Sequence, residues 1–183
     1  MRCLETELNG VKIIDPDIFK DQRGWFMETY SARKMESMGI SVVFLQDNHS
    51  MSEQKGIIRG LHFQNEPMAQ SKLVRCTRGS VRDIVVDIRA GSPSYRKWIS
   101  VELTSKSNRM LFIPKGFAHG FLTLEDNTEI QYKVDNYYSK DFDCSIRFDD
   151  PDIGIEWGID EPLLSEKDST APFLANSNCN FIY

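Results

Sequence analysis

Two of the three histidines in the sequence lie beside glycine in stretches that resemble β-strands. His62 follows Arg59-Gly60-Leu61, and His119 follows a Lys-Gly-Phe-Ala stretch. Each could be an ordinary histidine of the core. Imidazole titrates near neutral pH, however, and is the side chain most often used as a general base. Lys72 and Tyr132 lie in strand-like stretches as well, so a shared site would offer imidazole, ammonium and phenol.

That combination favours proton transfer over acyl transfer. The chain has no GxSxG serine, and its cysteines form no reactive motif. Taken one at a time, Lys72 could be a solvated charge at a strand edge and Tyr132 a core tyrosine. A site that combines both side chains with a histidine favours the catalytic interpretation.

The elements that must position these residues are mostly strands. About eleven short stretches rich in β-branched and aromatic residues alternate with turn signals such as Asp-Gln-Arg-Gly and Gly-Ser-Pro. They are Val11–Ile14, Trp25–Thr29, Val42–Leu45, Ile57–Phe63, Leu73–Thr77, Val81–Ile88, Trp98–Leu103, Met110–Ile113, Gly120–Leu124, Thr128–Val134 and Ser145–Phe148. One helix is predicted over Ala32–Met38, with Ser31 as its N-cap and Gly39 just past its end. This pattern predicts an all-β sandwich or barrel with one or a few short helices.

Alternation along the strands assigns side chains to faces. Tyr132 shares a face with Ile130 and Val134, which places its phenol inside the barrel. Asp83 and Asp87 share a face with two valines, so both carboxylates need buried partners.

The same alternation places Arg59 opposite His62. Either a bulge at Gly60 breaks the alternation, or Arg59 reaches the site around the rim of the barrel.

Length and composition favour one domain over residues 1–183. The chain has 40% hydrophobic residues and a net charge of −5, which excludes an overall basic footprint for nucleic acid or an anionic membrane. No apolar run is long enough for a membrane span, and the N-terminus lacks a signal-peptide core. Cys3, Cys76, Cys144 and Cys179 are widely spaced, which argues against zinc binding or disulfides and favours the cytoplasm.

The ordered set of motifs resembles the dTDP-4-dehydrorhamnose 3,5-epimerase family nearly end to end. The segments that carry the resemblance are Asp21–Glu28, Gln46–Ser50, Arg59–Gln64, Lys72–Val74, Val86–Arg89, Ser92-Pro93, Ile113–Phe121, Tyr132, Tyr137–Ser139, Asp150-Pro151, Ile155–Trp157 and Ser165–Asp168. The resemblance implies a cupin-type jelly-roll barrel without a cofactor or metal. The implied reaction inverts C3 and C5 of a dTDP-linked 4-keto-6-deoxyglucose through an enolate, as a step of dTDP-rhamnose biosynthesis.

The resemblance also assigns the catalytic roles. His62 would be the base, and Asp168 would accept a hydrogen bond from its second ring nitrogen. Lys72 would stabilise the negative charge on the C4 oxygen, and Tyr132 would return a proton from the opposite face. Without the resemblance, Asp168 in a polar tail would be taken as solvent-exposed.

A larger set of residues is expected to bind the nucleotide sugar. These residues are Arg23, Phe26, Glu28, Gln46, Asn48, Arg59, His119, Tyr138, Asp143 and Lys167. Arg23, Arg59 and Lys167 resemble diphosphate ligands, Tyr138 resembles a ring that stacks on the base, and His119 is expected to pair with Asp83.

The family pattern further implies a homodimer. Strands within about residues 1–50 would be exchanged between subunits, so that Arg23 and Glu28 complete the neighbour's site. Residues 162–183 would wrap over the barrel. The sequence departs from the family at Asp143, which is usually Glu, and at Phe148, which is usually Trp.

Three alternatives remain open at this level. The enzyme could invert only C3 or only C5. Residues 114–119 resemble half of a metal motif of the cupins, but the other half, which needs two nearby histidines, is missing. A barrel that binds sugars without catalysis would not require His62, Lys72, Tyr132 and Asp168 together.

Overall fold

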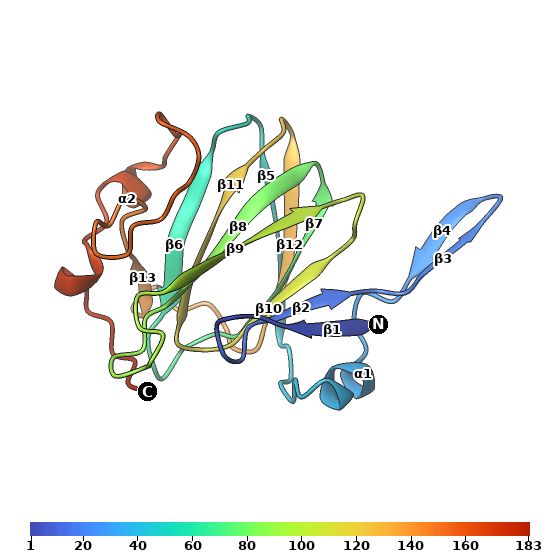
Figure 1. Cartoon of the computed structure of the whole chain (residues 1–183), viewed down its shortest axis with the longest axis horizontal. Helices are drawn as coiled ribbons and strands as arrows, with labels where there is room; N and C mark the ends of the chain where they lie inside the picture. The colour runs from blue at the N-terminus through green and yellow to red at the C-terminus, as the bar shows by residue number, and fades with distance from the viewer.

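The computed structural model describes every residue from Met1 to Tyr183, and its centre is a pair of antiparallel sheets packed face to face (Figure 1). The first sheet has six strands in the order β1-β2-β10-β7-β12-β5. Their bounds are β1 Arg2–Glu5, β2 Lys12–Asp15, β5 Gln46–Ser52, β7 Lys72–Arg78, β10 Met110–Ile113 and β12 Thr128–Val134.

The second sheet has five strands in the order β13-β6-β11-β8-β9. Their bounds are β6 Ile58–Gln64, β8 Ser80–Asp87, β9 Trp98–Thr104, β11 Phe117–Thr123 and β13 Asp143–Ser145. The remaining elements are the hairpin of β3 Ile18–Asp21 and β4 Gly24–Met27, the helices α1 Ala32–Ser37 and α2 Glu166–Ser169, and a 3₁₀ turn, Leu174–Asn176. The expected all-β sandwich with short helices is therefore confirmed.

Three layers of apolar side chains hold the sheets and their coverings together. The layer between the sheets includes Val74, Leu111 and Phe117. A second layer lies outside the five-stranded sheet under the C-terminal segment, and a third lies outside the six-stranded sheet under α1. Because β8 and β11 are covered on both faces, nearly all of their side chains are buried, including the polar Asp83, Asp87 and His119.

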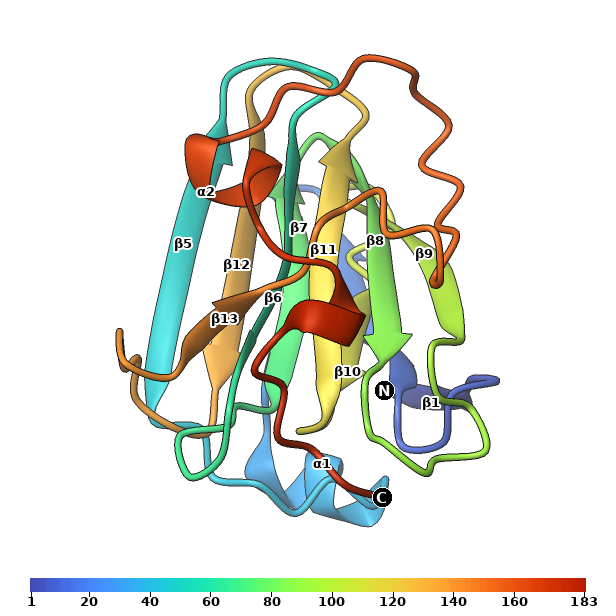
Figure 2. The same cartoon turned by 90° about the vertical axis from the view of Figure 1, so that its left-hand side faces the viewer.

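Two segments lie outside the central sandwich. The hairpin β3–β4 projects away from the body on the side opposite α2 (Figure 1). The C-terminal segment, drawn in orange and red, crosses the outer face of the five-stranded sheet and carries α2 close to β6 (Figure 2). It is fixed there by backbone bonds such as Ala90 N–H to Phe181 O at 3.0 Å. No helix of the structure has the length and apolarity needed to cross a membrane.

Helix α1 ends as the sequence predicts. Gly39 has φ +75°, and the N–H of Ile40 bonds back to Met35 O at 2.9 Å, which closes the last turn. Ser31 occupies the N-cap position, but its hydroxyl makes no capping hydrogen bond.

Several strand predictions were wrong in detail. The strand expected at Val42–Leu45 is irregular chain, and the strand that follows is the polar stretch β5. The last strand, β13, overlaps the expected Ser145–Phe148 only at Ser145. The short elements β1, β3 and α2 were not predicted at all, because each is too short to display a period.

Candidate active site

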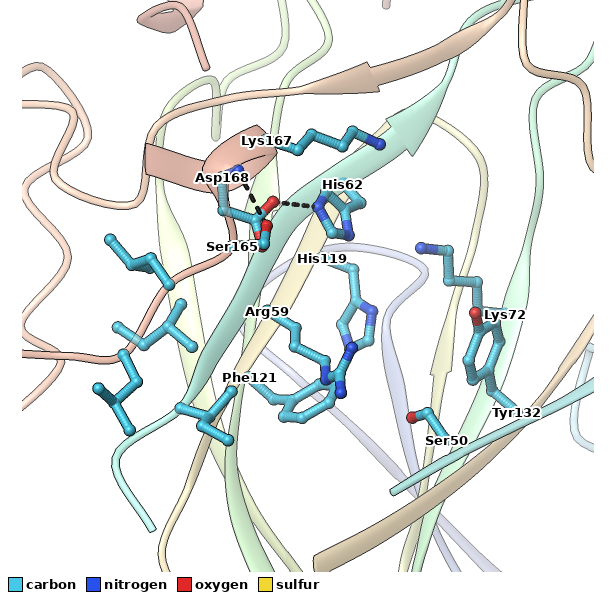
Figure 3. A pocket seen from close by; sticks show the side chains of 14 residues that line it. Ser50, Arg59, His62, Lys72, His119, Phe121, Tyr132, Ser165, Lys167 and Asp168 are labelled. Carbon is cyan, nitrogen blue, oxygen red and sulfur yellow. Dashed lines mark hydrogen bonds and ion pairs between the residues drawn. The ribbon is translucent and has the colours of Figure 1, made fainter. Parts of the chain in front are cut away.

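A cavity of about 510 Å³ continues the space between the two sheets toward α2. One wall is formed by β6 and β11 and carries Arg59, His62 and His119 (Figure 3). The facing wall is formed by β5, β7 and β12 and carries Ser50, Lys72 and Tyr132. Residues 163–168 close one end. The cavity thus brings together all four residues for which the sequence predicted catalytic roles.

His62 and Asp168 form a hydrogen-bonded pair in which the carboxylate is buried. His62 Nε2 lies 2.6 Å from Asp168 Oδ1, although the two residues are 106 positions apart in the chain. The Asp168 side chain is 3% exposed, whereas that of His62 is 33% exposed and open to the cavity. Burial alone raises the pKa of Asp168, but the hydrogen bond and charge of His62 together with the Ser165 hydroxyl hold it below its ordinary value. Asp168 is therefore an anion that fixes the His62 tautomer and leaves Nδ1 toward the cavity.

A β-bulge at Gly60 places Arg59 on the same wall as His62. His119 pairs with His62 and Phe121 with Arg59, so β6 has one residue more than β11 between these pairs. Gly60 has φ +124°, and a Cβ there would lie 2.6 Å from Gly120 Cα. Only glycine allows this approach of the two backbones. Of the two routes considered for Arg59, the bulge is the one used.

Lys72 and Tyr132 face the histidines from the other sheet. Burial lowers the pKa of Lys72 to about 8, because an ammonium is costly to desolvate, even though Asp83 and Asp143 favour its charge. Burial raises the pKa of the Tyr132 phenol, which keeps it protonated at neutral pH. Tyr132 packs beside Ile130 in the inner layer, as alternation predicts.

His119 forms a second, deeper pair with Asp83. His119 Nε2 lies 3.0 Å from both carboxylate oxygens, and the two side chains are 8% and 0% exposed. Burial, together with the charges of Lys72 and His62, lowers the pKa of His119, although Asp83 acts in the opposite direction. The other carboxylate that alternation predicted to be buried, Asp87, is bound by Arg89, Ser92 and Ser94. Both acidic residues have the partners that their burial requires.

Five of the residues expected to bind nucleotide form a linked group at the rim. Tyr138 and Lys167 both donate to Asp143 Oδ2, at 3.2 and 2.6 Å. Gln46 donates to Asn48 at 2.8 Å and accepts from the Tyr138 backbone at 3.3 Å. The Tyr138 ring is exposed, which leaves a face free for stacking.

The remaining predicted residues lie outside the cavity of their own chain. Arg23 and Phe26 are on the projecting hairpin, where Arg23 pairs with Asp21. Glu28 follows the hairpin and pairs with Lys34. No single chain brings these three residues to His62.

Sequence reasoning missed three residues of the site. Ser165 accepts a hydrogen bond from Asp168 N–H at 3.1 Å and so caps α2, a role that the spacing Ser-x-x-Asp could have signalled. Ser50 and Ser52 face the cavity side of β5, and no local signal marks them because the strand itself was not predicted. No three His, Cys, Asp or Glu side chains are grouped so that they could hold a metal ion.

Comparison with known proteins adds independent evidence. The family model for dTDP-4-dehydrorhamnose 3,5-epimerase matches residues 5–176. The dTDP-4-dehydrorhamnose 3,5-epimerase of Shigella flexneri is 49% identical over 169 residues, which span 92% of this chain and 93% of that protein.

Solved structures show the same similarity. A dTDP-6-deoxy-D-glucose-3,5-epimerase from Legionella pneumophila, in complex with dTDP-4-keto-L-rhamnose, superposes with a TM-score of 0.92 at 42% identity and covers 96% of this chain and 93% of that one. A 3'-monoepimerase from Streptomyces bikiniensis, in complex with dTDP-quinovose, has a TM-score of 0.87 at 33% identity and covers 93% and 86%.

Proposed function

The chain belongs to the dTDP-4-dehydrorhamnose 3,5-epimerase family and is an isomerase of nucleotide-linked 4-keto sugars; from this premise we propose how its side chains divide the reaction. A dTDP-linked 4-keto-6-deoxyglucose would place its sugar ring in the cavity between the sheets. His62 Nδ1 removes the proton beside the ketone, and the new imidazolium is stabilised by Asp168 2.6 Å from Nε2.

Loss of this proton leaves an enolate whose charge lies on the C4 oxygen. Lys72 is the cation that would stabilise this charge, because its ammonium lies inside the cavity on the wall opposite His62. One preorganised donor of this kind is worth roughly 3 kcal/mol in the transition state.

Tyr132 then protonates the carbon from the face away from His62. The observation that carries the proposal is that His62 and Tyr132 stand on different sheets, with the cavity between them (Figure 3). A ring held there meets a base on one face and an acid on the other, and this arrangement inverts a carbon.

The nucleotide extends from the sugar toward the rim. Arg59 and Lys167 hold the diphosphate, and Tyr138 stacks on the thymine. The substrate is dTDP-linked by analogy with the Legionella pneumophila complex. Asp143 is shorter than the usual Glu, yet it is in contact with both Tyr138 and Lys167, which supports a retained role at the rim.

We assign a single domain to residues 1–183 and a homodimer to the active enzyme. The outer edge of β5 is unpaired, and the projecting hairpin exposes Trp25 and Phe26 by 57% and 65%. An unpaired edge and an apolar hairpin suit each other as partners in a strand exchange, which would bring Arg23, Phe26 and Glu28 to the neighbour's cavity. Four unpaired cysteines suit a reducing compartment, so we assign the enzyme to the cytoplasm.

Subunit mixing tests the exchange. Arg23→Ala and His62→Ala subunits are each expected to be nearly inactive, but mixed dimers contain one site with neither change. Recovery of roughly a quarter of wild-type activity after random mixing supports a shared site. Recovery of none would contradict it.

The reaction itself is tested by solvent exchange. Incubation of the 4-keto sugar in deuterated water with this enzyme should place deuterium at both C3 and C5, as double epimerisation requires. Label at C3 alone would instead match the activity of the Streptomyces bikiniensis relative. No label at either carbon would reject proton abstraction and favour a binding protein. His62→Ala is expected to abolish exchange at both positions.

A further inference from the structure

The inner face of β5 carries a row of polar side chains that lies along the cavity. Gln46, Asn48, Ser50 and Ser52 point inward, whereas the residues between them are exposed on the outer face. Inward positions of a sandwich strand are normally apolar, as in the neighbouring β12. The inner face of β5 is therefore polar where a core strand is normally apolar, which suggests that this face contacts a ligand.

Three of the four side chains in this row are engaged within the protein. Gln46 donates to Asn48 at 2.8 Å, and Ser52 Oγ accepts from Arg59 Nε at 3.1 Å. Ser50 has no side-chain partner in the protein, and its hydroxyl lies on the cavity wall (Figure 3). A half-buried hydroxyl turned toward a cavity is available to a bound molecule.

Arg59 indicates which part of that molecule lies beside Ser50. Its guanidinium crosses to β5, where Nη2 also donates to Met51 O at 3.1 Å. Two of its five N–H groups are thus used to fix it on β5, and three remain for an anion. Ser50 lies two residues from Ser52 on the same face, about 7 Å along the strand. Figure 3 shows Ser50 close to the guanidinium end of Arg59.

We propose that Ser50 is a further substrate-binding residue, which donates its hydroxyl hydrogen to a phosphoryl oxygen of the diphosphate that Arg59 holds. Ser52 acts through Arg59 and is a positioning residue. The inference rests on the proposed function, because it requires a nucleoside diphosphate in the cavity. The Ser50 hydroxyl of β5 and the Arg59 guanidinium, which reaches β5 from β6, suit phosphate, which accepts several hydrogen bonds at once. Across the sheet Ser50 is aligned with Ile130, two residues along β12 from Tyr132.

The test compares Ser50→Ala with wild type in two assays. Titration calorimetry with dTDP and with thymidine separates phosphate contacts from nucleoside contacts, and steady-state kinetics separates KM from kcat. We expect dTDP to bind roughly tenfold to a hundredfold more weakly, KM to rise by a similar factor, and kcat and thymidine binding to change less than twofold. Ser107→Ala, in the turn between β9 and β10, is the matched control that should change nothing.

Three results would overturn the proposal. Equal losses for dTDP and thymidine would move the contact to the nucleoside, a fall in kcat alone would move it to the sugar, and unchanged dTDP binding would remove it. Because dTDP binding needs no catalysis, these outcomes stay separate from a failure of the epimerase mechanism. Thymidine binding also reports that the variant is folded.

Discussion

Replacement of Asp168 by Asn tests whether the buried pair is part of the catalytic base. The side chains are nearly the same size, so the change preserves packing at a position that is 3% exposed. It removes the negative charge that lies 2.6 Å from His62 Nε2. Asn can also donate to Nε2, which would move the ring proton to Nδ1 and leave no lone pair toward the substrate.

The size of the effect follows from these two losses. A hydrogen bond to a charged partner is worth about 1.5–3 kcal/mol, or roughly ten- to 150-fold in rate if it is fully developed in the transition state. The wrong tautomer removes the base itself, which typically contributes about 10² to 10⁴. We therefore expect kcat to fall by about 10² to 10⁴, with dTDP binding unchanged.

The assay is deuterium incorporation at C3 and C5, followed by mass spectrometry or NMR. Asp160→Asn, an exposed aspartate in the same C-terminal segment, is the matched control. An Asp168→Asn enzyme that exchanges both protons within threefold of the wild-type rate would refute the dyad. If the variant loses exchange activity and its melting temperature also falls well below that of the wild type, Asp168 has a structural role.

Four further outcomes are expected. Tyr132→Phe should retain deuterium exchange but give products of altered configuration, and an unchanged product would remove Tyr132 from the mechanism. For the free enzyme, kcat/KM should fall as the pH rises past about 8, because the Lys72 ammonium is lost there; a profile that stays flat to pH 10 would contradict this. Between about 8 and the ordinary 10.5 the unfolded state binds more protons than the folded one, so stability should rise with pH as activity falls. Activity should also survive exhaustive chelation, and loss that an added metal restores would favour a metal-dependent cupin.

The sequence predicted most of the sandwich because most of its strands follow the apolar pattern. It failed at β5, where the inward residues are polar. Gln46, Asn48 and Ser50 point inward and the residues between them face solvent, so neither face displays the apolar alternation on which the prediction relies. The missed strand is thus one that borders the cavity with a polar inner face, and this polarity is why the local pattern fails there.

The candidate site shows the same limit. Alternation placed Tyr132 correctly, because its neighbours on β12 are regular. It could not decide the side of Arg59, because the choice depends on the contact of Gly60 with Gly120 from another strand. Asp168 reaches His62 only through the path of the C-terminal segment, which no local signal encodes. The expected roles of Arg23 and Glu28 require the proposed second subunit, so a single chain leaves them a prediction.

The two His–Asp pairs of the cavity explain why one histidine and not the other suits the role of base. Both histidines lie within glycine-containing strands and both have a carboxylate within 3.0 Å, so motif and partner do not distinguish them. Depth does. A general base acquires a positive charge during the reaction, and burial makes that charge costly. The side chain of His119 is 8% exposed and burial lowers its pKa, whereas that of His62 is 33% exposed and faces the cavity. This difference supports the proposed role of His62 as the base, whereas His119, paired with Asp83, lines the cavity wall.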